Sequence, residues 1–442
     1  MKIYLVGGAV RDILLGKNIR DFDFSVEGLV RPIGKHIADE LGGAYYVLDD
    51  ERDMVRVIID DENMGQFDVD ISLLTGDSIE DDLRERDFTF NAMAIELGPH
   101  PCLIDPLGGY EALQNRILHM CGPDSLSNDP MRALRAVRMG LEFEMQMDDE
   151  LLTAMQSVTD QLKYSSMERY RDELFKIIRL KKNEKALLLC EKFGFLQHLF
   201  PGFRPIDQEK GLEFVRFSDY FTKLLTEQNA DVQTDDEFSK FAASRLGNYR
   251  GAMQGFFDKP LALYHTRRML ADYASIAEML AAENSDTVKK WCSRLTFSSS
   301  ETNFVLFTLQ AFSRLNGLTD FTGYTDVDIY RYFRKYKEGG IGGLILYLAE
   351  KYRYQEKPDA YKHWCECVVL AQDLLTAYFS RYMEVIDPKP LLSGNDIQDL
   401  IRMPAGPLIG QIKNSLIEAQ IRGSVQTVRE AESFVIQLVK NR

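Results

Sequence analysis

The chain has 442 residues, of which 45% are hydrophobic and 27% are charged. This length suits about three domains, and the composition is that of a globular protein rather than a disordered one. The formal net charge of −15 argues against a protein whose whole surface binds nucleic acid. Residues 301–442 contain 17 basic and 17 acidic residues, so all the excess negative charge lies in residues 1–300. A local basic patch in the last third can therefore still bind phosphate.

The ends and cysteines of the sequence indicate its compartment. The opening segment, MKIYLVGGAVRD, is too briefly apolar for a signal peptide, and no apolar run approaches the ~20 residues that span a bilayer. The six cysteines form no Cys-x-x-Cys pair, so neither a zinc site nor a disulfide framework is indicated. We expect a cytoplasmic protein with no membrane segment, and the sequence gives no sign of an obligate protein partner.

The predicted elements change in kind along the chain. Residues 2–6, 45–49, 54–60 and 66–72 are rich in Val, Ile and Tyr and predict strands. Helices are predicted at 9–16 and 30–43, each closed by glycine. From Pro130 onward, apolar residues recur at spacings of three and four, and strand signals fade. The sequence predicts an α+β fold, with a small N-terminal mixed α/β head and then an extended all-helical neck, body and tail.

A glycine pair lies between the first predicted strand and the first predicted helix. Gly7 and Gly8 let the backbone approach a ligand, and the start of the helix offers free N–H groups to an anion. A packing turn explains the same residues equally well. The pattern is neither the dinucleotide-binding G-x-G-x-x-G nor a P-loop, because no Gly-Lys-Ser/Thr follows.

Two aspartates one residue apart follow this helix. In a strand, Asp21 and Asp23 point to the same face with their Cα atoms ~6.6 Å apart. Two carboxylates at that separation can share a pair of magnesium ions ~3.5–4 Å apart. The alternative is an exposed turn with two solvated acids.

A second pair of acids occurs in the predicted strand QFDVDIS. Asp68 and Asp70 lie on one face of that strand, and adjacent strands are ~4.8 Å apart. One of these two acids can therefore complete a metal site with Asp21 and Asp23. The alternative is an edge strand that its charges keep soluble.

With these residues in view, the sequence resembles a known family. LVGGAVRDILLG followed by RDFDFS is similar to the nucleotidyltransferase signature of class II CCA-adding enzymes and bacterial poly(A) polymerases, which belong to the DNA polymerase beta superfamily. Further family motifs match in order at residues 86–96 (RDFTFNAMAIE), 105–113 (DPLGGYEAL), 128–139 (NDPMRALRAVRM) and 166–178 (SMERYRDELFKII). Residues 406–423 also resemble the tail of these proteins, whereas residues ~200–390 carry little that matches.

The resemblance implies that the protein extends the 3′ end of tRNA with nucleotides and releases pyrophosphate. It implies that Asp21 and Asp23 bind the Mg²⁺ ions of a two-metal site and that Asp68 is the third catalytic carboxylate, with Asp70 as its competitor. It also implies CTP, and ATP where adenosine is added, as substrates.

The resemblance further implies a set of nucleotide-binding residues. They are Gly7, Gly8 and Arg11 for the triphosphate, Arg86 and Asn91 for phosphate or sugar, Asp87 for the ribose, Asp129 and Arg132 for the base edge, and Arg135 and Arg138 for phosphates or for ion pairs within the neck. Asp12 either orients Arg11 or has no role. Two alternatives stay open, since Asn91 can be a buried polar cap and Asp129, with Pro130 in the first turn, can simply cap a helix.

The segment YRYFRKYK predicts contact with the RNA away from its 3′ end. It interleaves Arg331, Arg334, Lys335 and Lys337 with aromatic residues, a pattern that suits phosphate contact and base stacking. A solvated amphipathic helix is the alternative. Lys413, in the tail segment GPLIGQIK, is a further candidate for RNA phosphate, and there the alternative is a plain helix start.

The predicted domains are a catalytic head at 1–118, a helical neck with nucleotide recognition at 119–200, a helical body at 201–325 and an RNA-binding helical tail at 326–442. Three departures from the family pattern bear on specificity. Glu85 and Asn128 stand where the family usually has arginine and glutamate, and only 17 residues (69–85) separate Asp68 from Arg86. In full CCA-adding relatives a longer loop occupies this interval, so the short interval favours a CC-adding enzyme. The alternatives are a full CCA-adding enzyme, an A-adding enzyme, a poly(A) polymerase and, last, a non-catalytic RNA-binding protein.

Overall fold

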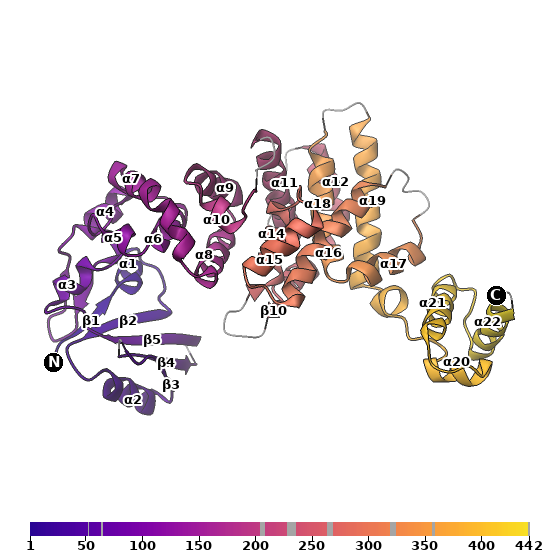
Figure 1. Cartoon of the computed structure of the whole chain (residues 1–442), viewed down its shortest axis with the longest axis horizontal. Helices are drawn as coiled ribbons and strands as arrows, with labels where there is room; N and C mark the ends of the chain where they lie inside the picture. The colour runs from indigo at the N-terminus through magenta and orange to yellow at the C-terminus, as the bar shows by residue number, and fades with distance from the viewer. Residues whose placement is uncertain are drawn as a thin grey trace. The chain divides into compact units, whose positions relative to one another are not determined.

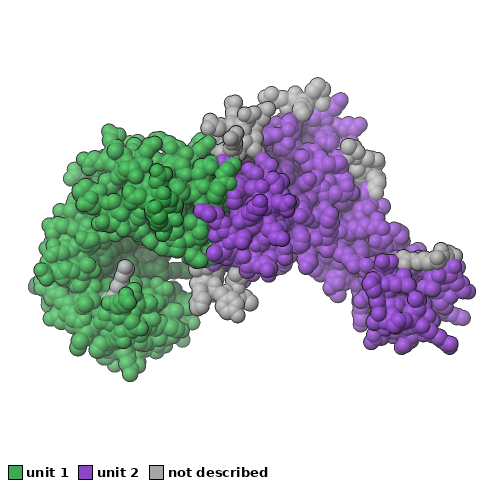
Figure 2. Space-filling view, viewed as in Figure 1, with its two compact units in different colours: residues 1–202 green, residues 203–442 purple. Residues whose placement is uncertain are grey.

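The computed structural model describes residues 1–51, 53–62, 65–203, 208–227, 236–262, 268–318, 324–355 and 359–440. The chain forms two compact units, residues 1–202 and 203–442 (Figures 1 and 2). A mixed α/β region opens the first unit, and helices dominate the rest of the described chain, which confirms the predicted α+β fold. The finer four-part division of the chain stays a prediction. Within the described residues, no helix is both long and apolar enough to cross a membrane.

A seven-stranded sheet organises the first unit (Figure 1). Its order is β3-β4-β5-β2-β1-β6-β7, and every neighbouring pair is antiparallel except β2 and β5, which are parallel. The strands are β1 (Ile3–Val6), β2 (Asp21–Val26), β3 (Ala44–Asp49), β4 (Met54–Asp61), β5 (Gly65–Leu73), β6 (Ala94–Glu96) and β7 (Cys102–Ile104). The four strands predicted from composition are all present.

Helices pack on this sheet and continue beyond it in the same unit. They are α1 (Gly8–Leu14), α2 (Val30–Leu41), α3 (Ile79–Arg84), α4 (Gly109–Asn115), α5 (Ser125–Asn128), α6 (Met131–Glu142), α7 (Asp149–Val158), α8 (Met167–Arg179), α9 (Asn183–Lys192) and α10 (Phe195–Leu199). The first two are the helices predicted at 9–16 and 30–43. A short parallel pair, β8 (Ile117–Leu118) with β9 (Gln146–Met147), was not predicted, since two-residue strands carry no periodicity.

The two faces of the sheet differ in chemistry. Helix α2 covers one face, where it buries Val30 and Ala38 against alternate apolar residues of β4 and β5 such as Val57 and Ile71. Because side chains alternate along a strand, the residues between these apolar ones point to the opposite face. Arg56, Asp68 and Asp70 occupy such positions, so β4 and β5 carry charges on the face that α2 does not cover.

Helix α3 packs on this second face, farther along the sheet. Its buried Ile79 and Leu83 contact Tyr4 and Val6 of β1. The antiparallel register sets Val6 opposite Asp23, so Asp23 shares this face. The residues that follow α3 are thereby brought to the end of the sheet where Asp21 and Asp23 lie.

The second unit is almost entirely helical in its described part. Its helices are α11 (Gln208–Thr226), α12 (Glu237–Leu246), α13 (Arg250–Phe257), α14 (Leu270–Met279), α15 (Ser285–Arg294), α16 (Ser299–Asn316), α17 (Asp326–Tyr336), α18 (Gly339–Tyr352), α19 (Ala360–Phe379), α20 (Gly394–Ile401), α21 (Pro407–Ile421) and α22 (Val428–Lys440). One minimal strand pair, β10 (Pro260–Ala262) with β11 (Arg268–Met269), accompanies them. Helices α20, α21 and α22 share a small apolar core of their own.

The motif DPLGGYEAL has a structural role in positioning the first unit's polar residues. Both carboxylate oxygens of Asp105 accept backbone N–H bonds at the start of α4, from Gly109 at 2.7 Å and from Tyr110 at 2.9 Å. A Cβ atom on Gly109 would lie only 2.2 Å from the carbonyl oxygen of Thr89. Thr89 opens the single 3₁₀ turn that carries Asn91, so the absence of a side chain at Gly109 fixes the place of that turn.

We expect Gly109→Ala to destabilise the protein by about 1–3 kcal/mol, because the added methyl group overlaps a backbone atom that cannot move alone. Urea unfolding followed by circular dichroism measures this change. Gly98→Ala is the control, since a Cβ there meets no atom within 4 Å, and its effect should stay within about 0.5 kcal/mol. Equal effects of the two substitutions would contradict this account of the motif.

Candidate active site

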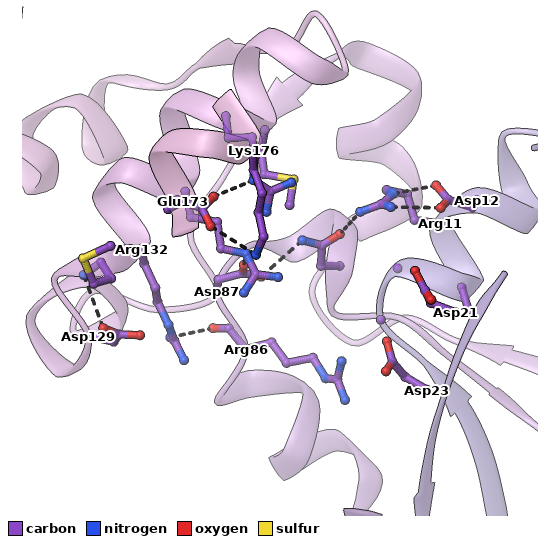
Figure 3. A pocket seen from close by; sticks show the side chains of 18 of the residues that line it. Arg11, Asp12, Asp21, Asp23, Arg86, Asp87, Asp129, Arg132, Glu173 and Lys176 are labelled. Atoms are coloured by element: carbon purple, nitrogen blue, oxygen red, sulfur yellow. Dashed lines mark hydrogen bonds and ion pairs between the residues drawn. The ribbon is translucent and has the colours of Figure 1, made fainter. Parts of the chain in front are cut away.

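A single cavity of about 940 Å³ in the first unit brings the predicted residues together (Figure 3). This volume lies within the range of small-molecule binding sites. Its lining includes every residue predicted to bind metal or nucleotide, namely Gly7, Gly8, Arg11, Asp21, Asp23, Arg86, Asp87, Asn91, Asp129, Arg132, Arg135 and Arg138. The third predicted carboxylate, Asp68, is not part of the lining and lies beside Asp21 on the sheet.

The glycine turn packs closely against two charged side chains. Gly7 has φ +69°, and a Cβ atom there would lie 2.8 Å from Nη1 of Arg86 and 3.5 Å from Oδ2 of Asp23. The turn therefore requires glycine for both its backbone conformation and its surroundings. Because it does, a guanidinium and a carboxylate both approach the backbone where α1 begins.

Asp21 and Asp23 face the cavity from the start of β2 (Figure 3). Burial and then the neighbouring Asp68 raise the pKa of Asp21, while burial and then Asp70 raise the pKa of Asp23. Burial and a neighbouring carboxylate thus both disfavour the ionised forms of Asp21 and Asp23, and a bound cation would favour them. Within the described ranges, no three His, Cys, Asp or Glu side chains are grouped as metal ligands. Mg²⁺ needs no such group, since it commonly uses one or two carboxylates together with substrate phosphates, so the pair fits this ion.

The parallel register of β2 and β5 sets Asp68 opposite Asp21 and Asp70 opposite Asp23. All four carboxylates therefore occupy one patch of the sheet. Asp70 accepts two hydrogen bonds from Arg56, from its Nε and Nη2, each 2.7 Å long. Oδ2 of Asp68 lies 3.3 Å from Nη1 of the same arginine. Both oxygens of Asp70 are thus held by Arg56 and only one oxygen of Asp68 is, which favours Asp68 as the third carboxylate.

Three different groups hold Arg11. Its Nε and Nη2 donate to the carboxylate of Asp12 at 2.9 and 3.0 Å, and its Nη1 donates to Oδ1 of Asn91 at 2.8 Å (Figure 3). The guanidinium carbon also lies 4.3 Å from the ring centroid of Phe143. Asp12 therefore orients Arg11, and the cation is fixed in place at the edge of the cavity.

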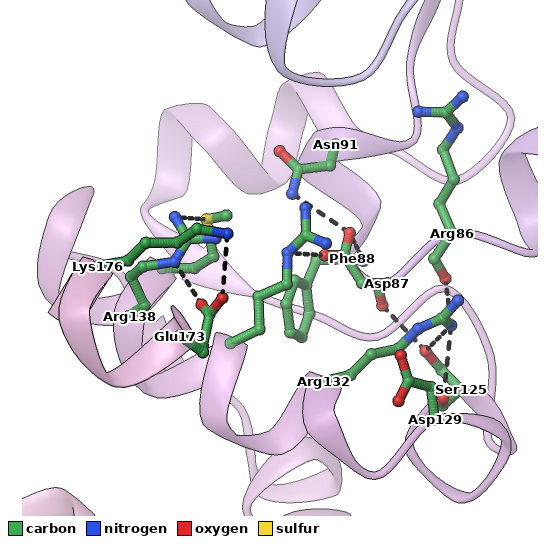
Figure 4. Close-up of polar contacts among 12 residues, drawn as sticks. Arg86, Asp87, Phe88, Asn91, Ser125, Asp129, Arg132, Arg138, Glu173 and Lys176 are labelled. Atoms are coloured by element: carbon green, nitrogen blue, oxygen red, sulfur yellow. Dashed lines mark hydrogen bonds and ion pairs between the residues drawn. The ribbon is translucent and has the colours of Figure 1, made fainter. Parts of the chain in front are cut away.

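Asp87 joins two parts of the first unit. Its Oδ1 accepts from the backbone N–H of Phe88 and from Nδ2 of Asn91, while Nε of Arg135 lies 2.7 Å from its Oδ2 (Figure 4). Asn91 is buried, as the polar-cap alternative requires, but its side chain joins Arg11 to Asp87 rather than capping a helix, and its contact with a nucleotide stays a prediction.

The residues predicted to read the base already have protein partners. Oδ2 of Asp129 lies 2.6 Å from Nη2 of Arg169 on α8, and its Oδ1 accepts from the backbone N–H of Met131. The cap alternative for Asp129 is therefore confirmed in part, although Pro130 lies just before α6 rather than in its first turn. Each carboxylate oxygen keeps a second lone pair that can accept from a ligand.

Arg132 is an anchor for the segment after α3 (Figure 4). Its Nη2 donates to the carbonyl oxygen of Glu85 at 2.7 Å, and its Nη1 donates to that of Arg86 at 3.0 Å and to Oγ of Ser125 at 2.9 Å. The contact to Glu85 uses the backbone, so the unusual side chain at that position does not affect it.

Arg138 is part of an ion-pair cluster between α6 and α8. It donates to Glu173 and Glu142, and Glu173 also accepts from Lys176 (Figure 4). These contacts match the ion-pair alternative that was given for this arginine. They also show how the motif SMERYRDELFKII shapes one wall of the cavity.

The prediction that aromatic residues of α17 stack on RNA bases is wrong. Tyr330, Tyr332, Phe333 and Tyr336 are all at least 95% buried, so none presents a ring face to a base. The cations lie on the exposed side of the helix, and Arg331 makes two hydrogen bonds to Glu418 at 2.8 and 2.6 Å. This is the amphipathic helix given as the alternative.

The other residues predicted to contact RNA are exposed or half-buried basic residues of the second unit. Arg334, Lys335 and Lys337 are exposed, so their predicted phosphate contacts stay predictions. Arg334 also donates to the hydroxyl of Tyr330. Lys413 is half-buried in the second turn of α21, away from the helix start that the prediction invoked, and its contact with RNA stays a prediction too.

Sequence reasoning missed two residues that hold the site together. Buried Asp82 accepts from Nη2 of Arg86, from the backbone N–H of Thr75 and from Oγ of Ser25. Asp82 lies in α3 and Arg86 two residues beyond its end, and an acid four residues before an arginine is a signal for such a pair. Arg56 was also missed, although a lone cation between apolar residues of a predicted strand indicates a partner on the polar face.

Comparisons with known proteins give the family. Residues 3–119 match the poly A polymerase head domain, and residues 144–206 match a domain described as the probable RNA and SrmB-binding site of polymerase A. The A-adding tRNA nucleotidyltransferase of Deinococcus radiodurans is 28% identical over 98% of this chain and 94% of its own length. The CC-adding tRNA nucleotidyltransferase of Synechocystis sp. is 26% identical over 99% of this chain and 94% of its own. The chain belongs to the class II CCA-adding enzyme and poly(A) polymerase family.

Solved structures of this family share the fold. The CCA-adding enzyme of Bacillus stearothermophilus in complex with CTP has a TM-score of 0.67 and 19% identity, covering 100% of this chain and 94% of that one. The Thermotoga maritima CCA-adding enzyme complexed with tRNA has a TM-score of 0.61 and 20% identity, covering 99% and 91%. Family membership confirms that the chain is an enzyme of the nucleotidyltransferase type.

Arg132→Lys should lower the free energy of unfolding by about 1–3 kcal/mol, because a single ammonium group cannot reach both carbonyl oxygens and the serine hydroxyl. Guanidinium-induced unfolding measures this loss. Arg169→Lys is the matched control, since its ion pair to Asp129 is largely exposed and should cost less than about 1 kcal/mol. Equal unfolding free energies of the two variants would contradict the interpretation of Arg132 as an anchor.

Proposed function

We propose that this chain is a tRNA nucleotidyltransferase that adds two cytidines to the 3′ end of tRNA, using CTP and releasing pyrophosphate. The observation that carries the proposal is the cavity in which Asp21 and Asp23 face the glycine turn, with Arg11 and Arg86 on either side. Three relatives that match over nearly the whole chain are named tRNA nucleotidyltransferases, which supports the choice of RNA.

The arginines bind the triphosphate in this mechanism. Arg11 is held by Asp12 and Asn91, and Arg86 by Asp82, so both guanidinium groups are oriented before a ligand arrives. Such fixed groups bind phosphate oxygens with little loss of side-chain freedom. The Gly7 turn leaves the backbone accessible next to them.

The carboxylates serve the chemical step. Mg²⁺ held by Asp21 and Asp23 would lower the pKa of the attacking hydroxyl and neutralise charge that develops on the leaving pyrophosphate. The 3′ oxygen of the RNA forms a bond to the α-phosphorus, and the bond from that phosphorus to the oxygen bridging the α- and β-phosphates breaks. Asp68, beside Asp21 and outside the cavity lining, accepts the proton of the 3′ hydroxyl.

Base selection is assigned to Asp129 and Arg132. The exocyclic amino groups of cytosine and adenine can donate to the remaining lone pairs of Asp129, and a guanidinium N–H can donate to a ring acceptor. Arg169 fixes the carboxylate through a contact of 2.6 Å. Selection of a base without a nucleic-acid template then depends on the orientation of these two side chains.

The choice of CC rather than CCA addition rests on the interval between Asp68 and Arg86. Strand β5 continues to Leu73 and α3 begins at Ile79, so residues 74–78 are the only connection and no long loop fits there. A second relative of near-full-length match, from Geobacter sulfurreducens, is also named a CC-adding enzyme, at 28% identity over 98% of this chain. The A-adding enzyme of Deinococcus radiodurans matches as well, so addition of adenosine alone is the second candidate. Cytoplasmic location and the lack of an obligate protein partner remain predictions.

Incubation of tRNA transcripts that lack the CCA end, or that end in C or CC, tests the specificity. With Mg²⁺ and both CTP and ATP, we expect transcripts without the end to gain two cytidines and no adenosine, read on a sequencing gel. A completed CCA end would contradict CC specificity. Extension of the CC-ending transcript alone would identify an A-adding enzyme, and long adenosine tails would identify a poly(A) polymerase. Absence of any incorporation would favour an RNA-binding protein without catalysis.

Asp23→Asn should reduce nucleotide incorporation at least about 100-fold, because the charge stabilisation that a catalytic metal supplies is worth several kcal/mol. Radiolabelled CTP incorporation under single-turnover conditions measures the rate. Asp39→Asn, at an exposed site on α2 in the same unit, is the control and should keep the wild-type rate. If the Asp23 variant stayed active, the assignment of the metal pair would be wrong.

A further inference from the structure

We propose that Arg56 is a positioning residue of the metal site: it holds Asp70 apart from the metal-binding pair, leaves Asp68 as the third carboxylate, and weakens divalent cation binding until substrate arrives. This inference rests on the proposed function, because it assumes that Asp21 and Asp23 bind the metal. It assigns a role to a residue that lies outside the family motifs of the sequence.

Strands β2, β5 and β4 are neighbours in the sheet (Figure 1), and their register carries the inference. In the β2–β5 pair Asp21 faces Asp68 and Asp23 faces Asp70, and in the β4–β5 pair Arg56 faces Asp70. These five side chains therefore form one patch on the sheet face that α2 leaves uncovered. In β4 the position opposite Asp68 is occupied by Ile58, so Arg56 is the cation that β4 contributes there.

The contacts of Arg56 distinguish the two acids of β5. Two of its nitrogens bind the two oxygens of Asp70 at 2.7 Å each, which is the bidentate geometry of a strong arginine–carboxylate pair. The third nitrogen, Nη1, lies 3.3 Å from a single oxygen of Asp68. The side chain of Asp70 is only 13% exposed, against 26% for Asp68. Asp70 is thus held, and Asp68 retains an oxygen that is free to turn toward Asp21.

The charge of Arg56 has a second consequence. Four carboxylates on adjacent strands repel one another, and burial raises that cost. A guanidinium within the patch offsets part of the repulsion without any metal, and it also opposes the approach of a divalent cation. Arg56 therefore stabilises the folded site in the absence of metal. It also lowers the affinity of the site for a divalent cation. Triphosphate oxygens then supply the remaining ligands when substrate binds.

Binding of Mn²⁺ to the full-length protein without nucleotide tests this role, with free Mn²⁺ followed by electron paramagnetic resonance. We expect Arg56→Gln to bind Mn²⁺ roughly three- to tenfold more tightly than the wild type, since it removes a nearby positive charge and releases Asp70. Arg56→Lys keeps the charge but cannot hold both oxygens of Asp70, so its affinity for Mn²⁺ should lie between that of the wild type and that of Arg56→Gln. Arg31→Gln, which breaks a pair with Asp50 and Asp53 outside the cavity lining, is the matched control and should leave the affinity unchanged.

A double-mutant cycle separates the effect of Arg56 on the position of Asp70 from the effect of its positive charge on the metal. If Arg56 holds Asp70 away from the metal, Asp70→Asn should weaken Mn²⁺ binding more in the Arg56→Gln background than in the wild type. Equal effects in both backgrounds, or an Arg56→Gln variant whose affinity is unchanged or weaker, would overturn the inference. Should Arg56→Gln fail to fold without metal but fold with Mn²⁺ present, that dependence supports the inference, whereas failure under both conditions overturns it.

One variant separates this inference from the proposed function. Asp23→Asn should abolish tight Mn²⁺ binding. If the wild type itself does not bind Mn²⁺, or if Asp23→Asn binds it unchanged, the proposed metal pair is wrong and the inference falls with it. If Asp23→Asn loses Mn²⁺ and Arg56→Gln behaves like the wild type, only the role of Arg56 is wrong.

Discussion

The in-register parallel pairing of β2 with β5 is the constraint on which the rest of the head depends. It sets Asp21 against Asp68 and Asp23 against Asp70, so the fold places four carboxylates where they repel one another. Buried carboxylates without compensation are costly, and the surrounding structure supplies positive charge. Arg56 lies at one side of the patch, and Arg86 approaches Asp23 and the glycine turn from the other. A divalent cation can satisfy the negative charge that these arginines leave uncompensated.

Many polar groups of the cavity are preorganised because they contact one another. A chain of contacts runs from Asp12 through Arg11, Asn91 and Asp87 to Arg135, and it connects α1 to α6 through the 3₁₀ turn between them. Each group is thereby held in one orientation by side chains from distant parts of the sequence. A ligand that binds here meets donors and acceptors that are already oriented, which reduces the side-chain entropy lost on binding.

The sequence was enough to predict residue pairs that lie close together in the chain. It did not predict contacts between residues that only the pairing of distant strands brings together. The two-residue period of a strand was enough to place Asp21 and Asp23 on one face, and the motif order was enough to assign the family. The strand period alone did not separate Asp68 from Asp70; only the family resemblance selected Asp68, because the partner that holds Asp70 depends on which residue of β4 lies opposite. The error at Tyr332 and its neighbours was avoidable, since aromatic residues at spacings of three and four in a helix indicate a buried stripe.

The two departures from the family motifs differ in their consequences. Asn128 ends α5 and is not part of the cavity lining, so its replacement of glutamate does not remove a group that faces the ligand. Glu85 does line the cavity, and there a negative charge replaces a positive one next to the arginines that would bind phosphate. Its backbone carbonyl still accepts from Arg132, so the wall keeps its shape while its charge changes. The departure at Glu85 therefore changes the charge of the wall rather than its geometry, and in the proposed function it would weaken attraction for the triphosphate while leaving Asp129 and Arg132 in place.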